Sequence, residues 1–104
     1  MSGLTVTLSW EHEDALRYGA RTMFSTGPAV DGVRAFMNDL MIVGTNERVE
    51  LPAAWLEAFL VAFKRATLIT GLKGLAKDRL RRQTAKIQKA VDSSAVDRLG
   101  MVAG

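Results

Sequence analysis

Apolar residues recur at helical spacing over most of this chain, and that recurrence limits the possible fold more than any other feature. Between residues 52 and 70 the apolar positions cover about half of a helical circumference, while Glu57, Lys64 and Arg65 lie on the other side. An apolar stripe this wide is typical of a central core helix. The same periodicity predicts three further helices, over residues 10–24, 28–43 and 72–91.

Residues at the ends of these segments support the boundaries. Pro28 follows the turn Ser25–Gly27 and suits the first position of a helix. An amide hydrogen at that position has no partner within the helix, so proline, which has none, loses no hydrogen bond there. Ser94 and Asp97 have the spacing of a capping box. They predict a separate short helix over residues 95–100.

The N-terminal segment has a different period. Leu4, Val6 and Leu8 alternate with polar residues up to Trp10, which predicts one short strand over residues 4–10. A lone strand leaves backbone groups unpaired, so we expect Leu4, Val6 and Leu8 to pair with a second copy of the chain or with a neighbouring protein. Weak pairing with Glu47–Leu51 is the alternative within the chain. The predicted fold is mainly α: a compact bundle of about four helices plus one short N-terminal strand, in a single domain over residues 1–104.

Composition excludes several classes of protein. The chain has 104 residues, which fits one domain, and it has no cysteine, which excludes disulfides and thiolate sites. The first ten residues lack the basic and apolar regions of a secretory signal. The apolar run at residues 51–63 contains Glu57 and is too short to span a bilayer, so we expect no membrane partner. The expected location is cytoplasmic, or assembled in a virion.

Charge is divided unevenly between the two halves of the chain. Residues 1–50 carry four basic and seven acidic residues, whereas residues 51–104 carry ten basic and four acidic ones. Most of the excess lies on the predicted helix over residues 72–91, where a basic face could meet nucleic acid, an acidic protein or only solvent. Its candidate interaction residues are Lys77, Arg79, Arg81, Arg82, Lys86 and Lys89.

Residues with catalytic or metal-binding chemistry are few. His12 is the only histidine, and His12-Glu13 begins like the zinc motif HExxH, but Leu16 stands where the second histidine belongs. Glu11, Glu13 and Asp14 point in different directions on a helix, and favourable interaction with its positive N-terminus explains them. We therefore expect His12 to be structural or solvated, and we expect no metal, no cofactor and no enzymatic activity.

Residues 4–43 resemble a ribbon–helix–helix DNA-binding module, with a strand at 4–8, helices at 10–24 and 28–43, and a short turn between the helices. The resemblance implies that two chains pair their strands and that Thr5, Thr7 and Ser9 read bases in the major groove. The chain departs from that family, because its strand carries no Arg, Lys, Asn or Gln for bidentate base contacts. The half of the chain that contains the module is also net acidic.

Two functional hypotheses follow from these features. The first is a non-enzymatic assembly or adaptor protein that binds other proteins or forms homo-oligomers, for example a small structural component of a phage particle or of its assembly machinery. The alternative is a dimeric DNA-binding regulator of ribbon–helix–helix type.

Overall fold

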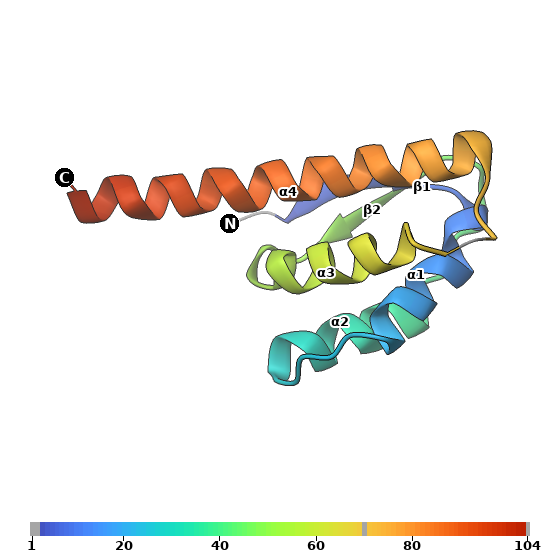
Figure 1. Ribbon diagram of the computed structural model, residues 1–104, viewed down its shortest axis with the longest axis horizontal. Helices are drawn as coiled ribbons and strands as arrows, with labels where there is room; N and C mark the ends of the chain where they lie inside the picture. The colour runs from blue at the N-terminus through green and yellow to red at the C-terminus, as the bar shows by residue number, and fades with distance from the viewer. Residues whose placement is uncertain (1–2, 70, 104) are drawn as a thin grey trace.

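A computed structural model describes the backbone of residues 3–69 and 71–103 and the side chains of residues 3–69 and 71–94. It confirms the mainly helical fold with a short N-terminal strand (Figure 1). The strands are β1 (Leu4–Leu8) and β2 (Glu47–Leu51), and two 3₁₀ turns precede helices, η1 (Trp10–His12) and η2 (Ala53–Trp55). The helices are α1 (Glu13–Arg21), α2 (Pro28–Asp39), α3 (Leu56–Ala66) and α4 (Gly74–Ala103).

The N-terminal strand finds its partner within the chain. β1 pairs with β2 in an antiparallel two-stranded sheet, with Leu4 opposite Leu51, Val6 opposite Val49 and Leu8 opposite Glu47. The expectation of a partner from another chain or protein was therefore wrong, and the weaker alternative, Glu47–Leu51, is the strand that pairs. In this register, alternate side chains of both strands lie on the core side of the sheet. β2 can place its side chains there because β1 holds it in the sheet.

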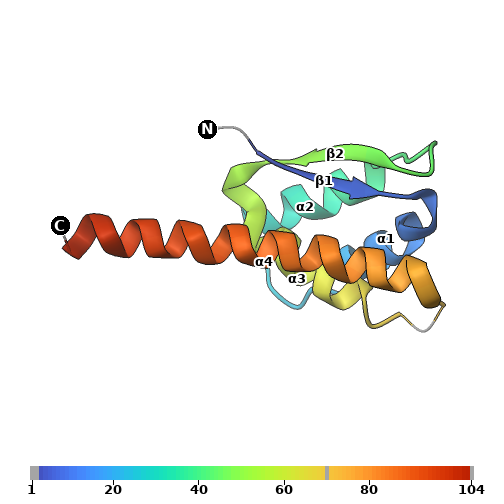
Figure 2. The same ribbon diagram turned by 90° about the horizontal axis from the view of Figure 1, so that it is seen from above.

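The second edge of β1 is also occupied. Backbone groups alternate in direction along an antiparallel strand, so those of Thr5 and Thr7 point away from β2. The Thr7 amide donates a hydrogen bond to Gln83 Oε1 at 3.0 Å, and Lys86 Nζ donates to the Thr5 carbonyl oxygen. Figure 2 shows β1 lying between β2 and α4. Side chains of α4 thus take the place of a third strand.

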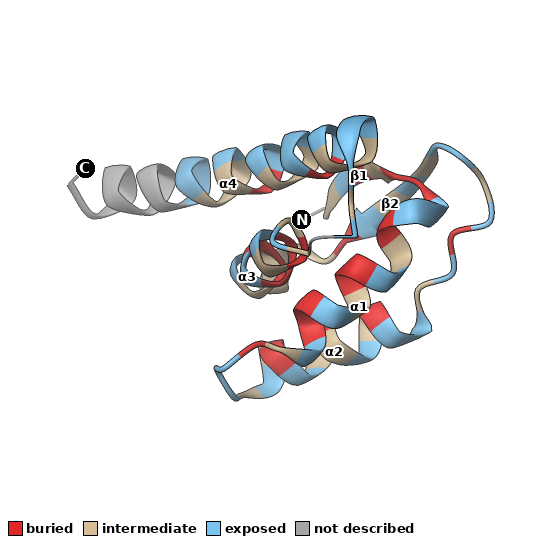
Figure 3. Ribbon diagram, turned by 45° about the vertical axis from the view of Figure 1, so that its right-hand side comes forward, coloured by how far each residue is buried: buried red, intermediate tan, exposed pale blue. Residues whose placement is uncertain are grey.

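The core is densest where α1 crosses α3. Leu16, Phe59 and Phe63 are fully buried there, and Figure 3 shows buried positions on the facing sides of the two helices. The crossing is close because Gly19 has no side chain: a Cβ built on it would lie 2.2 Å from the carbonyl oxygen of Ala62. Glycine at this position therefore sets the distance between the two helices.

Three predicted helices are shorter than their apolar patterns. The first begins with η1 and ends at Arg21, the third begins with η2 after Pro52, and α2 ends at Asp39 rather than at residue 43. Leu40 has extended backbone angles, and the Glu13 carboxylate accepts a hydrogen bond from the Ile42 amide at 2.8 Å. Ile42 is buried while both its neighbours are exposed, so extended chain buries the apolar residue that the pattern assigned to a helix.

The C-terminal helix is longer than predicted. α4 continues without interruption from Gly74 to Ala103, so a separate helix over residues 95–100 does not form. No glycine or proline lies between Gly74 and residue 99 to break it, and Ser94 is inside the helix instead of at a cap. The side chain of Asp97 lies outside the described residues.

Candidate interaction surfaces

His12 has a structural environment. Its side chain is 1% exposed; Nδ1 accepts a hydrogen bond from the Ser9 amide at 3.1 Å, and Nε2 lies 2.9 Å from the carbonyl oxygen of Ala76. This pairing assigns the neutral tautomer with hydrogen on Nε2, which donates to Ala76. Burial lowers the pKa of His12 below its usual 6.5. The ring therefore joins η1 to the first turn of α4.

Among the side chains that the structure describes, no group of three His, Asp or Glu residues is placed to hold a metal ion. In the same part of the chain, no helix combines the length and apolar character needed to cross a membrane.

Four of the six candidate residues on α4 form one stripe. Arg79, Arg82, Lys86 and Lys89 are exposed and fall within roughly 80° of the helical circumference at 100° per residue. We call these four residues the basic stripe. Lys77 and Arg81 lie roughly 120–160° from the centre of that arc, so the helix does not bring them to the same face.

The cations of the basic stripe have no acidic partners among the described residues. The ion pairs that the structure shows lie elsewhere, between Glu13 and Arg17 and between Asp31 and Arg34. Lys86 donates to the neutral Thr5 carbonyl oxygen and so keeps its charge uncompensated. A helix face of uncompensated cations attracts anions.

A small pocket lies where the basic stripe meets the sheet. It has a volume of about 200 Å³ and is lined by Thr7, Leu8, Ser9, His12, Asn46, Arg79, Arg82 and Gln83. Arginine forks, a hydroxyl and an amide are the donors that hold oxyanions in proteins. No acidic residue lines the pocket.

The structure thus brings together two sets of residues that the sequence analysis treated as alternatives. Thr7 lines the pocket beside two arginines of the basic stripe, and Thr5 lies next to Lys86. Ser9 is only 4% exposed, and its amide is bonded to His12, so little of it can reach a ligand. Asn46 and Gln83 were missed, because nothing in the sequence places a loop amide and a helix amide beside one strand.

A second surface lies on the other side of the molecule and is apolar. It contains Tyr18, Phe24 and Leu68, which are between 49% and 88% exposed. We call these residues the apolar surface. Part of it is an open groove of about 600 Å³ between α1 and the segment after α3, lined by Asp14, Ala15, Tyr18, Arg21, Arg65, Leu68 and Ile69.

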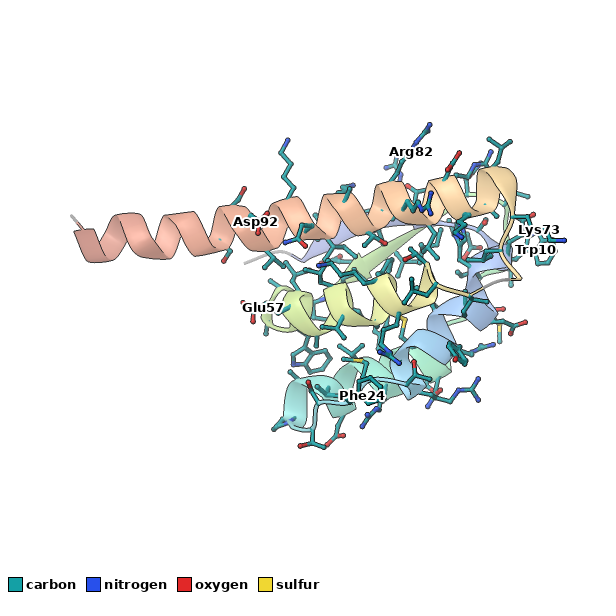
Figure 4. The ribbon with its side chains drawn as sticks, in the orientation of Figure 1. Trp10, Phe24, Glu57, Lys73, Arg82 and Asp92 are labelled. Carbon is teal, nitrogen blue, oxygen red and sulfur yellow. The ribbon has the colours of Figure 1, made fainter. Side chains whose placement is uncertain are left out.

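Charged side chains lie beside the apolar surface. The guanidinium of Arg65 stacks 4.4 Å from the centre of the Phe24 ring and also donates to Thr22 Oγ1 at 2.8 Å. Arg21 is exposed and makes no ion pair with a described residue. In Figure 4, Arg82 and Phe24 lie on opposite sides of the molecule, so the two surfaces face different directions.

The sequence holds one signal of the apolar surface, because Tyr18 falls outside the apolar stripe of the first helix. Phe24 and Leu68 gave none, since the predicted helices over residues 10–24 and 52–70 include them and the observed helices end before them. Comparisons of the chain with protein-family models, with curated proteins and with solved structures found no match.

Proposed function

We propose that this chain is a non-enzymatic adaptor that binds a partner protein through its apolar surface. The observation that carries the proposal is the exposure of large apolar side chains at and beside one groove: Phe24 is 88% exposed, Leu68 77% and Tyr18 49%. Exposed apolar side chains gathered at one groove usually mark an interaction site. Tyr and Arg, both present at this groove, are also among the residues that contribute most to protein–protein binding.

The groove favours one kind of occupant. It lies beside α1 and is lined by more apolar than polar surface, which suits the apolar face of a partner's amphipathic helix. Arg21, which lines the groove, makes no ion pair with any side chain that the structure describes, so a partner carboxylate beside the apolar face would complement it. Membership of a larger assembly, such as a phage particle or its assembly machinery, is consistent with such an adaptor.

The ribbon–helix–helix alternative depends on strand pairing between two chains. Here one edge of β1 is paired with β2, and the other is bonded to Gln83 and Lys86. A regulator built on a shared ribbon would have to release one of these edges first. Any contact with nucleic acid is therefore better sought on α4 than on a paired ribbon.

The test compares two substitutions of equal chemistry. Leu68→Asp places a charge in the groove, and the matched control Met41→Asp places one at an equally exposed position outside it, since Leu68 is 77% and Met41 74% exposed. We expect immobilised wild-type chain and Met41→Asp to retain the same partner from an extract of the source cells, and Leu68→Asp to lose it. Titration of the purified partner should then show at least a tenfold weaker Kd for Leu68→Asp, about 1.4 kcal/mol or more.

Two outcomes would contradict the proposal. One is retention of the same proteins by all three chains. The other is self-association through the groove. In that case the molecular mass measured by light scattering would rise with concentration for the wild type but not for Leu68→Asp, because the groove would be an interface between copies of this chain.

A further inference from the structure

We propose that the basic stripe and the adjoining pocket bind the phosphate backbone of double-stranded nucleic acid, with one phosphate between Arg79 and Arg82. This site is separate from the apolar surface and does not depend on the adaptor proposal. An adaptor with both surfaces would join a nucleic acid to a protein.

The pocket supplies the first step. Arg79 and Arg82 are one helical turn apart on α4 and line the same pocket, which Thr7 and Asn46 line from the sheet side. A volume of about 200 Å³ accepts a phosphate group. Because no carboxylate lines the pocket, nothing in it opposes an anion.

The length of the stripe supplies the second step. Arg79 and Lys89 are ten residues apart on one helix, which is about 15 Å at 1.5 Å per residue. Over about 15 Å of duplex axis, one strand carries about four phosphates. Four cations therefore face a similar number of charges on one strand, without any need for base contacts.

The side chains around the stripe distinguish nucleic acid from an acidic protein. From Lys77 to Ser94, no large apolar side chain of α4 is exposed. Protein–protein interfaces usually have an apolar centre, and this face has none. The same stretch of α4 has no aromatic residue on which single-stranded bases could stack, which favours a duplex.

Salt dependence provides a quantitative expectation. Release of counterions from about four phosphates gives a slope of about −3.6 in log K against log salt for duplex DNA. Affinity should therefore fall about 100-fold between about 50 and about 200 mM salt. We would measure it by fluorescence anisotropy with a short labelled DNA duplex and the full-length chain.

Two double variants of equal charge test whether the stripe is the contact. Arg82→Gln/Lys89→Gln removes two stripe cations, while Lys77→Gln/Arg81→Gln removes two from elsewhere on α4. Each charge removed from the stripe should reduce the slope by about one unit, so the first variant should lose about two units and more than tenfold in affinity. The control should lose less than about threefold. Circular dichroism melts check that both variants fold.

The pocket has its own test. Arg79→Lys/Arg82→Lys keeps the charge and removes the planar forks, so affinity should fall severalfold at an unchanged slope. Absence of duplex binding at about 50 mM salt, or equal losses in the two Gln variants, would overturn the proposal. Competition by polyglutamate as effective, per charge, as unlabelled duplex would also overturn it, in favour of an acidic protein ligand.

Discussion

Gly19→Ala should destabilise the protein, although alanine is the better helix former. The added Cβ would lie 2.2 Å from the Ala62 carbonyl oxygen and 3.0 Å from the Ala66 amide nitrogen. Both atoms belong to the backbone of α3, so no side-chain rotation can relieve the contact. Ordinary contact begins near 3.4 Å, so α1 and α3 would have to separate by about 1 Å.

Two opposing terms set the size of the effect. Overpacking of a close helix crossing costs typically 1–3 kcal/mol. Replacing a helical glycine by alanine returns up to about 1 kcal/mol. We expect a cost in the upper half of that range, because no side-chain rotation can relieve the contact. The free energy of unfolding should then fall by roughly 1–2 kcal/mol, and Tm by roughly 5–15 °C for a domain of this size.

The matched control is Gly32→Ala, the same substitution inside α2. There the nearest atoms to the added Cβ belong to the Trp55 ring, at 2.7 Å, and that half-buried side chain can shift. We expect Gly32→Ala to change the free energy of unfolding by less than about 0.5 kcal/mol, because side-chain movement offsets most of the contact. Urea unfolding followed by circular dichroism measures both. A Gly19→Ala protein as stable as the wild type, or a larger loss at Gly32, would refute the role given to the helix crossing.

Two further predictions concern the contacts that α4 makes with the N-terminal segment. Burial lowers the pKa of His12 below its ordinary value of 6.5, so the unfolded chain binds a proton at this ring more readily than the folded one. The free energy of unfolding should therefore be full above pH 6.5 and decline as the pH falls from there to the folded pKa. His12→Gln should flatten this part of a urea-unfolding pH series. A His12→Gln protein with the wild-type pH profile would contradict this. Gln83→Ala removes the acceptor of the Thr7 amide, so the free energy of unfolding should fall by about 1 kcal/mol and the Thr7 amide should exchange its hydrogen faster. Gln88→Ala is the control and should leave that amide unchanged, because the Gln88 side chain bonds to Asp92 on the same helix.

Periodicity predicted the elements that bury a continuous face. β1 alternates and α3 has a wide apolar stripe, so each could be identified without knowledge of its neighbours. β2 could not, because Glu47, Arg48 and Glu50 give it the composition of a loop, and Leu51 is its one fully buried residue. Its strand conformation comes from pairing with β1, and the paired residues are 39 to 47 positions apart in the chain.

The candidate interaction residues could be predicted by type but not by arrangement. The sequence indicated a basic helix, and helical geometry alone separates Lys77 and Arg81 from the other cations. The position of Thr7 beside Arg79 depends on how α4 lies along β1, which is a long-range packing result. The side chains of the apolar surface are hydrophobic, so composition alone could not distinguish them from core residues.

The attachment of α4 along β1 has a consequence for how the chain folds during synthesis. The hydrogen bonds that close this edge join residues 76 and 81 positions apart. A nascent chain that has reached only α3 can pair β1 with β2, yet it displays an open strand edge to other chains. Residues 83–86 must be synthesised before that edge is covered. A chain truncated before α4 should therefore be prone to aggregate, whereas a chain truncated after Lys89 should keep the β1 edge covered.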